Sequence, residues 1–385
     1  MIGPITLTKL PVIEFGVGKI KTLGAHLAGC KRAFFLVDKP LEAMVSPVLE
    51  DLQGSGIAVE ASSEVVPEPP IETLEKLLSP VQRFNPDVVV GIGGGSTMDL
   101  AKLLAVLFKG EQKIDSIIGI GNVRGRDVKL ITASTTSGTG SEVTPIAVLT
   151  DTKAKLKKGV VSPYIVPDVA IVDPQLTVGM PASITASTGM DAMTHCIEAF
   201  TNRYSHPIID TIACEGMRLI AANIETAVTE GRNLDARTAM CLGSLYGGMC
   251  LGPVNTAAVH ALAYPLGGTY KIPHGVSNSV LLPFVMNFNL PACAEKYAEM
   301  ARLIGAADQE RTQSAARQGI AAIRSQSMQC GIPSSLKELD IPESAIETMA
   351  ESAMAVTRLL NNNPRALTLK DVIAVYRAAY AGTIE

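Results

Sequence analysis

Residues 87–102 read DVVVGIGGGSTMDLAK, an apolar run that passes through three consecutive glycines into a helical pattern. The run 87–93 has the length of a strand and almost no polar face, which predicts a strand buried on both sides in a parallel sheet. Glycine lets the backbone approach a ligand closely, and a helix N-terminus offers free N–H groups with a partial positive charge. The stretch therefore predicts a strand, a loop suited to a phosphate, and a helix.

This loop differs from the usual nucleotide-binding motifs. Gly91-x-Gly93-x-x-Ser96 lacks the third glycine of the dinucleotide motif, and no Gly-Lys-Ser/Thr sequence follows it. Asp38, the acidic residue suited to a ribose, precedes the loop, whereas the usual motif places it afterwards. The alternative interpretation is a tight strand-to-helix turn without a ligand.

Comparable strand and helix patterns alternate on both sides of this stretch. Helical patterns separate the other predicted strands, which are 33–38, 59–66, 128–131 and 165–173, with a short strand or two within 5–15. Alternation of buried strands and amphipathic helices predicts an α/β domain, a parallel sheet with helices on both faces. We place this domain at residues 1–180.

A second loop of small residues follows the strand 128–131. Residues 132–144 read TASTTSGTGSEVT, and such densely packed hydroxyls and amides can hydrogen-bond a pyrophosphate or a ribose. A polar surface loop is the alternative. Two loops of this kind at the carboxyl ends of strands in one sheet favour a cofactor crevice.

From residue 182 onward the sequence shows helical periodicity and few strand-like runs, which predicts an all-α domain at 181–385. Asp191 and His195 are four residues apart and share one face of a helix there. His260 and His274 follow, and Pro265, Gly267, Gly268 and Pro273 between them predict that one helix ends and a second returns to the same point.

One carboxylate and three imidazoles suit a divalent ion such as Fe(II) or Zn(II), and the sequence does not choose between them. The alternative for any single histidine is a core side chain that hydrogen-bonds a neighbour. Asp191, His195, His260 and His274 together favour a metal site.

Composition excludes several classes of protein. The chain has 385 residues, 47% of them hydrophobic, and a net charge of −4, with its densest basic group at 153–158. This charge argues against nucleic acid as a partner. The seven cysteines contain no CxxC pair, and neither a secretory signal nor a membrane-spanning run is evident. We expect a soluble cytoplasmic protein.

These motifs resemble those of the iron-containing (group III) alcohol dehydrogenases, the family that includes lactaldehyde:propanediol oxidoreductase and has the dehydroquinate synthase-like fold. The resemblance covers nearly the whole chain. Its most specific parts are the following: Gly94-Gly95-Ser96 with Asp99 and Lys102, residues 135–144, GMDAMTHCIEA at 189–199, and His260 through Pro273-His274-Gly275.

The resemblance implies roles for particular residues. Asp191, His195, His260 and His274 would bind Fe(2+) or Zn(2+). The cofactor-binding set would be Asp38, Gly94, Gly95, Ser96, Asp99, Thr135, Thr139 and Lys157. A carboxylate at Asp38 accepts from the ribose 2′-OH of NAD and repels the 2′-phosphate of NADP, which predicts NAD(H). The family also implies a small alcohol or aldehyde substrate and a homodimer or larger homo-oligomer.

Two positions depart from the family pattern. Tyr264 stands where many relatives have a second histidine four residues after the third ligand, and a phenol is a poor base at neutral pH. We still include Tyr264 among the candidate catalytic residues. Glu68 stands in a Pro-x-Pro turn where relatives often have Asn.

The predicted activity is hydride transfer between a small alcohol and nicotinamide. One alternative is a sugar-phosphate cyclase-type lyase of the same fold, but the stretches 190–200 and 256–275 contain only one Lys or Arg, Lys271, to hold an anionic substrate. A maleylacetate reductase-like oxidoreductase and a non-enzymatic metal or nucleotide binder are further alternatives. The candidate substrate-lining residues are Ile146, Val148, Leu251, Thr256 and Tyr264, which do not identify the alcohol.

Overall fold

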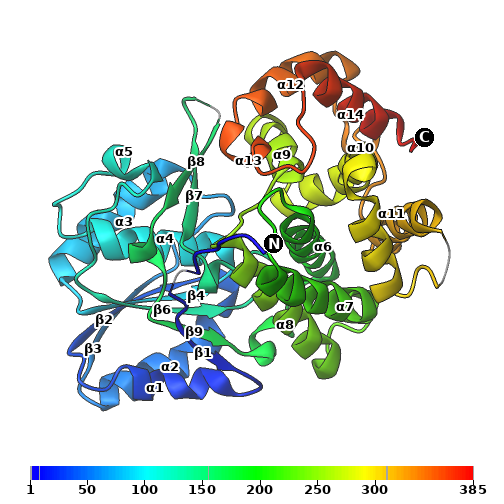
Figure 1. Ribbon diagram of the computed structural model, residues 1–385. Coiled ribbons are helices and arrows are strands. Elements are labelled where there is room, and N and C mark those ends of the chain that lie inside the picture. The colour runs from blue at the N-terminus through cyan, green and yellow to red at the C-terminus, as the bar shows by residue number, and fades with distance from the viewer. Residues whose placement is uncertain (1, 8, 155, 309–310, 385) are drawn as a thin grey trace. The chain divides into compact units, whose positions relative to one another are not determined.

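The computed structural model describes residues 2–7, 9–154, 156–308 and 311–384 (Figure 1). The chain divides into two compact units. The α/β unit comprises Thr8–Thr136 and Gly140–Val178, and the helical unit comprises Met1–Leu7, Ser137–Thr139 and Gly179–Glu385.

A six-stranded sheet in the order β1-β9-β6-β4-β2-β3 forms the centre of the α/β unit. Its strands are β1 (Val12–Phe15), β2 (Arg32–Val37), β3 (Ala58–Ser62), β4 (Val88–Gly93), β6 (Lys129–Ser134) and β9 (Val169–Val172). Every neighbouring pair in it is parallel, as predicted. β4 is buried along its whole length because helices cover both of its faces.

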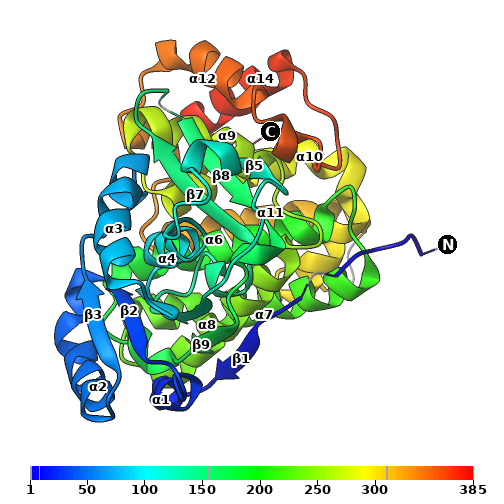
Figure 2. The same cartoon turned by 90° about the vertical axis from the view of Figure 1, so that its left-hand side faces the viewer.

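Helices cover this sheet on two sides (Figure 2). The helices are α1 (Leu23–His26), α2 (Glu42–Gly54), α3 (Ile71–Phe84) and α4 (Gly95–Leu107). Phe34 and Leu36 of β2 pack with α3 and α4, whereas Phe35 and Val37 pack with α1 and α2. This alternation along one strand produces a separate apolar layer on each face.

A second sheet, which the sequence interpretation missed, lies in the same unit. It contains β5 (Gly119–Ile120), β8 (Leu156–Val161) and β7 (Ile146–Asp151) in that order, and β7 and β8 are antiparallel. Polar residues at the ends of β7 and β8 interrupt the apolar pattern, and the lysines at 153–158 suggested only a basic segment. A short helix, α5 (Ile114–Ile117), precedes β5.

The helical unit is built around α6 (Ala182–Thr201), which is buried on nearly all sides from Thr185 to its end. The other helices are α7 (Pro207–Thr229), α8 (Leu234–Leu251), α9 (Ala258–Tyr270), α10 (His274–Leu303), α11 (Thr312–Gln329), α12 (Ile346–Met354), α13 (Thr357–Leu360) and α14 (Leu369–Ala381). Within the described part of this unit no strand forms, as predicted. None of the helices formed by the described residues is both long and apolar enough to cross a membrane.

Candidate functional site

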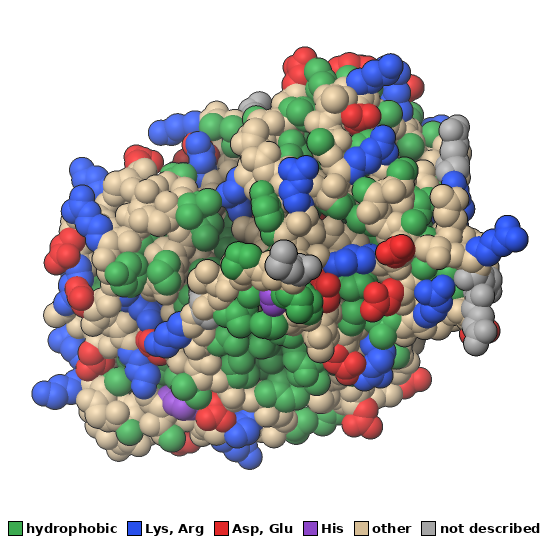
Figure 3. All heavy atoms as spheres, viewed as in Figure 1, with side chains coloured by type: hydrophobic (Ala, Val, Ile, Leu, Met, Phe, Trp, Pro, Cys, Tyr) green, Lys and Arg blue, Asp and Glu red, His purple; other side chains and the backbone are tan. Residues whose placement is uncertain are grey.

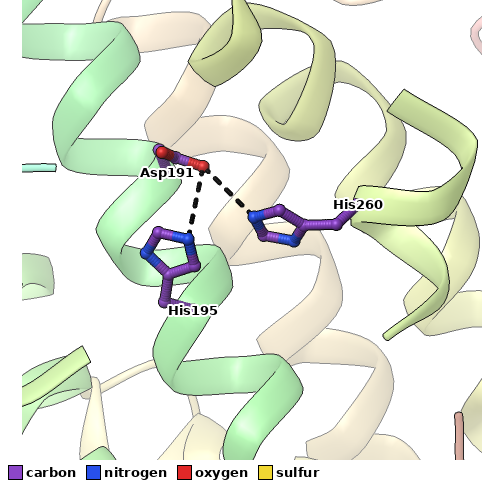
Figure 4. A group of neighbouring side chains, drawn as sticks. All are labelled: Asp191, His195 and His260. Atoms are coloured by element: carbon purple, nitrogen blue, oxygen red, sulfur yellow. Dashed lines mark ion pairs between the residues drawn. The ribbon is translucent and has the colours of Figure 1, made fainter. Parts of the chain in front are cut away.

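The four predicted metal ligands come together in the helical unit. Asp191 and His195 project from α6 and His260 projects from α9 (Figure 4). His274 is the first residue of α10. The Nε2 atoms of His195, His260 and His274 lie 3.9, 3.6 and 3.9 Å from Asp191 Oδ1.

The break between α9 and α10 differs from the predicted one. Pro265, Gly267 and Gly268 were expected to end the first helix, but they lie inside α9, which continues to Tyr270. Packing of their buried positions within the helical unit outweighs the local preference against helix. The chain turns instead at Lys271, whose φ of 60° ends α9, and at Pro273, which precedes the first residue of α10.

The ligand atoms of Asp191, His195 and His260 all lie within 4.8 Å of one another, so they could hold one divalent ion. His274 lies outside that group and joins it through its distance to Asp191. Two atoms that each lie about 2.1 Å from one ion can be at most about 4.2 Å apart, and all three separations from Asp191 Oδ1 are shorter. His260 Nε2 is buried and has no hydrogen-bond partner among the described residues. An unpartnered buried polar atom carries a desolvation cost, which a cation bound in place of a proton at Nε2 would offset.

Glu198, to which the sequence interpretation gave no role, orients His260. Its carboxylate lies 2.6 Å from His260 Nδ1 and accepts the Val259 N–H at 2.7 Å. A proton held on Nδ1 leaves the Nε2 lone pair for a cation. Its position three residues after His195, as a second carboxylate on a helix that is buried along most of its length, was the available signal.

Asn278 is a second residue that sequence reasoning missed. It lies one turn after His274 in α10, and its Nδ2 donates to Asp191 Oδ1 at 2.7 Å. The same Nδ2 lies 3.1 Å from His274 Nε2. Asn278 thus connects α10 to the carboxylate on α6.

The charges of the site are strongly coupled. Burial opposes ionisation of Asp191, but the neighbouring imidazoles hold the pKa of its carboxyl below the usual range. Burial lowers the pKa of His195 to about 4. Burial also disfavours protonated His260, but Glu198 and Asp191 outweigh this and raise its pKa to about 9. A cation must therefore displace a proton from His260, so metal binding should weaken at low pH.

Tyr264 lies one turn beyond His260 on α9 and is half-buried. Its place on the helix that carries His260 is that of the second histidine in the family pattern.

The glycine loop begins α4 in the α/β unit, as predicted. Gly94 precedes the helix, and its N–H donates to Asp38 Oδ2 at 2.9 Å. The Thr97 hydroxyl donates to the other oxygen of Asp38. A Cβ at Gly93 would lie 2.6 Å from Asp38 Cγ, so glycine is required for this approach. Both oxygens of Asp38 therefore already support the loop.

Asp99 connects α4 to the second loop and to the hairpin β7–β8. It accepts from the Ser141 hydroxyl at 2.6 Å and from the Val148 N–H at 2.8 Å. Lys102, which is fully buried, donates to Ser141 Oγ at 2.7 Å and to the Ile146 carbonyl at 2.8 Å. These contacts give Asp99 a structural role within the predicted cofactor region.

The remaining predicted cofactor residues fall in different parts of the fold. Gly95 and Ser96 open α4, and the Thr135 N–H donates to the Gly93 carbonyl at 3.1 Å. Thr139 belongs to the segment Ser137–Thr139, which groups with the helical unit. Lys157 lies on β8, where its Nζ is 2.7 Å from Glu68 Oε2.

Two models of one known family match the two parts of the chain. The model described as iron-containing alcohol dehydrogenase matches residues 11–174, and the model described as Fe-containing alcohol dehydrogenase family, C-terminal, matches residues 185–380. Long-chain-alcohol dehydrogenase 1 of Geobacillus thermodenitrificans is 39% identical over 374 residues, which cover 96% of this chain and 93% of that protein.

Two solved structures are informative. A crystal structure of 1,3-propanediol oxidoreductase has a TM-score of 0.93 and 37% identity, and the match covers 99% of this chain and 100% of that one. Sulfoacetaldehyde reductase from Bifidobacterium kashiwanohense in complex with NAD+ has a TM-score of 0.87 and 29% identity, over 98% and 99% of the two chains. These proteins have different named substrates on one fold.

Proposed function

Because the chain belongs to the iron-containing alcohol dehydrogenase family, we propose that it transfers hydride between a small alcohol or aldehyde and NAD(H) with a divalent metal ion. The observation that carries this proposal is the convergence of three imidazole nitrogens on Asp191 Oδ1. Membership of this family implies a metal ion and NAD(H). The sheet domain at 1–180 would bind the dinucleotide and the helical domain at 181–385 the metal.

Asp191, His195, His260 and His274 are the proposed metal ligands, with Fe(II) as the first choice and Zn(II) as the alternative. A bound ion acts as a Lewis acid on an alcohol or carbonyl oxygen, and nicotinamide accepts or gives the hydride. Glu198 and Asn278 hold the ligand side chains in place through the contacts described above.

The loops that follow β4 and β6 are the proposed cofactor site. Gly94, Gly95 and Ser96 provide backbone approach at the start of α4, and Thr135, Thr139 and Lys157 extend the site. Asp38 favours NAD over NADP because its carboxylate repels a 2′-phosphate. That repulsion persists although both oxygens of Asp38 accept hydrogen bonds from the protein.

Tyr264 would orient the substrate by hydrogen bonding rather than act as a base, since a phenol keeps its proton at neutral pH.

Nucleic acid remains a disfavoured partner. The net charge is −4, and on the face in Figure 3 acidic and basic side chains are interspersed. We also propose a homodimer or larger homo-oligomer from the family resemblance, which light scattering would check.

The test is metal analysis of the purified protein together with a panel of alcohols and aldehydes. We expect bound iron or zinc and steady NADH production from at least one simple alcohol. The His260→Ala and His274→Ala variants should lose metal and turnover while retaining their far-ultraviolet circular dichroism spectra. Undiminished turnover after metal removal would contradict the proposal.

The panel also separates the alternatives. A sugar-phosphate cyclase uses NAD only transiently and yields no net NADH, whereas a maleylacetate reductase-like enzyme would oxidise NADH only with maleylacetate. No hydride transfer with any member of the panel or with added maleylacetate, and no consumption of a sugar phosphate, would favour a binding protein.

A further inference from the structure

Glu68 is held in place at the edge of the glycine loop. Its backbone N–H donates to Ser96 Oγ at 3.1 Å, which ties the turn at 67–70 to the first turn of α4. Its carbonyl accepts from the Thr150 hydroxyl at 2.9 Å. The backbone of Glu68 has a φ of 51°, in the left-handed region that Glu adopts less readily than Asn. The fold thus places this residue despite its local preference.

The Glu68 side chain engages Lys157 of the hairpin. Lys157 Nζ lies 2.7 Å from Glu68 Oε2 and 2.8 Å from Thr150 Oγ1. The Lys157 side chain is 8% exposed and that of Glu68 is 28% exposed. Partial burial weakens solvent screening of this pair relative to an ion pair in bulk water.

The ion pair lies close to the proposed phosphate-binding residues. Glu68 contacts Ser96 directly. Burial raises the pKa of Asp99, one turn further along α4, and the Lys157 cation is one of the groups that oppose this rise. A dinucleotide pyrophosphate at this loop would meet the Lys157 cation together with the Glu68 anion. The carboxylate offsets much of the attraction that the cation provides.

We propose that Glu68 holds Lys157 in place through their ion pair and offsets the positive charge of Lys157 at the glycine loop. This ion pair thereby limits the affinity of the protein for the dinucleotide. This inference rests on the proposed function, because it concerns the same cofactor site. It assigns to Glu68 a positioning role that weakens cofactor binding and so promotes cofactor release.

The test is direct titration of the full-length protein with NADH, followed by fluorescence, in wild type and Glu68→Gln. Gln keeps the length of the side chain and removes its charge. We expect Kd to fall about fivefold, the size of a partly screened charge pair, and the gain to shrink as salt is added. Lys157→Gln should raise Kd.

Two further variants complete the design. Glu72→Gln is the matched control, because its carboxylate accepts from the Thr152 hydroxyl on the same hairpin, at 2.8 Å, and we expect an unchanged Kd. Glu68→Asn removes the charge and also suits the left-handed backbone, so it should fold and should show the same gain if the Gln variant folds poorly.

The outcomes separate this inference from the proposed function. A wild-type protein that binds no NADH would overturn both. NADH binding in wild type with an equal or higher Kd in both Glu68 variants would overturn the inference alone. Because NADH and NADPH share the pyrophosphate, the gain should be the same for both. A much larger gain for NADPH would place Glu68 near the 2′-phosphate and contradict the assignment.

Discussion

At the scale of single residues, Glu198 determines which nitrogen of His260 is available to a cation. In Glu198→Gln the amide can present an N–H toward His260 Nδ1, which favours the tautomer with its proton on Nε2. We expect metal affinity to fall by about 10- to 100-fold, the usual effect of losing such a partner.

Competition with a chelator of known affinity measures this change. Glu215→Gln is the control, because Glu215 pairs with Arg218 on the exposed part of α7. Equal metal affinities in wild type and Glu198→Gln would show that Glu198 does not control the tautomer.

Glu142 gives a prediction for the pH dependence of stability. Burial raises the pKa of its carboxyl from 4.5 to about 7, so the folded state retains a proton that the unfolded state loses. Its contribution to stability is therefore complete below pH 4.5 and is lost as the pH rises through about 7. The difference corresponds to about 3 kcal/mol.

The measurement compares Glu142→Gln with wild type by denaturant unfolding between about pH 4.5 and 8. This window ends at the pKa of Lys102, which burial lowers to about 8, so Lys102 stays mostly protonated through the part of the window in which Glu142 titrates. We expect the free energy of unfolding of wild type to fall relative to that of the variant as the pH rises. A constant difference would mean that Glu142 ionises normally in the folded protein.

At the scale of elements, the close approach of α10 to α6 brings His274 to the other ligands. A Cβ at Gly275 would lie 2.7 Å from the Ser187 carbonyl carbon of α6. Gly275→Ala should therefore displace the first turn of α10, destabilise the protein by about 1–3 kcal/mol, and weaken metal binding through His274.

Thermal unfolding and metal content check this prediction. Gly179→Ala is the matched control, because a Cβ there would have no neighbour within 4 Å. Normal metal affinity in a destabilised Gly275→Ala protein would show that His274 tolerates the displacement.

The elements also show what the sequence could predict. The strands β2, β4 and β6 were found because continuous apolar runs are the strongest signal of a buried parallel strand. The hairpin β7–β8 was missed because its pattern is interrupted by Thr150, Lys157 and Lys158. Thr150 and Lys157 contact the Glu68 turn, which is distant in sequence, so no local pattern reveals these contacts.

The sequence also predicted the proposed metal ligands of the candidate site, but not the residues that hold them in place. The spacing of Asp191 and His195 indicated a shared helix face. The turn residues between His260 and His274 indicated that these two histidines return to the same point, and the family resemblance supported the same four ligands. Glu198 and Asn278 were not found, because a polar residue within a helix does not show which buried partner it contacts. The predicted end of α9 was too early, because tertiary packing outweighed the local preference of Pro265 against helix.

At the scale of the whole molecule, the two units have separate apolar cores. The helical unit has its own cluster of buried residues around α6, and the α/β unit has one cluster on each face of its sheet. The proposed metal ligands all belong to the helical unit, whereas Gly94, Ser96 and Lys157 belong to the α/β unit. Bound metal should therefore stabilise the helical unit, and bound NADH should stabilise the α/β unit.

Hydrogen exchange followed by mass spectrometry tests this division. Metal at about a hundredfold excess over its Kd should stabilise what it binds by about 2.7 kcal/mol. We expect this protection in α6, α9 and the start of α10, and NADH should instead protect the loops after β4 and β6. The control is the His274→Ala variant, in which metal should protect little while NADH protects as in wild type. Equal protection of β4 and α6 by metal alone would mean that the two units respond as one.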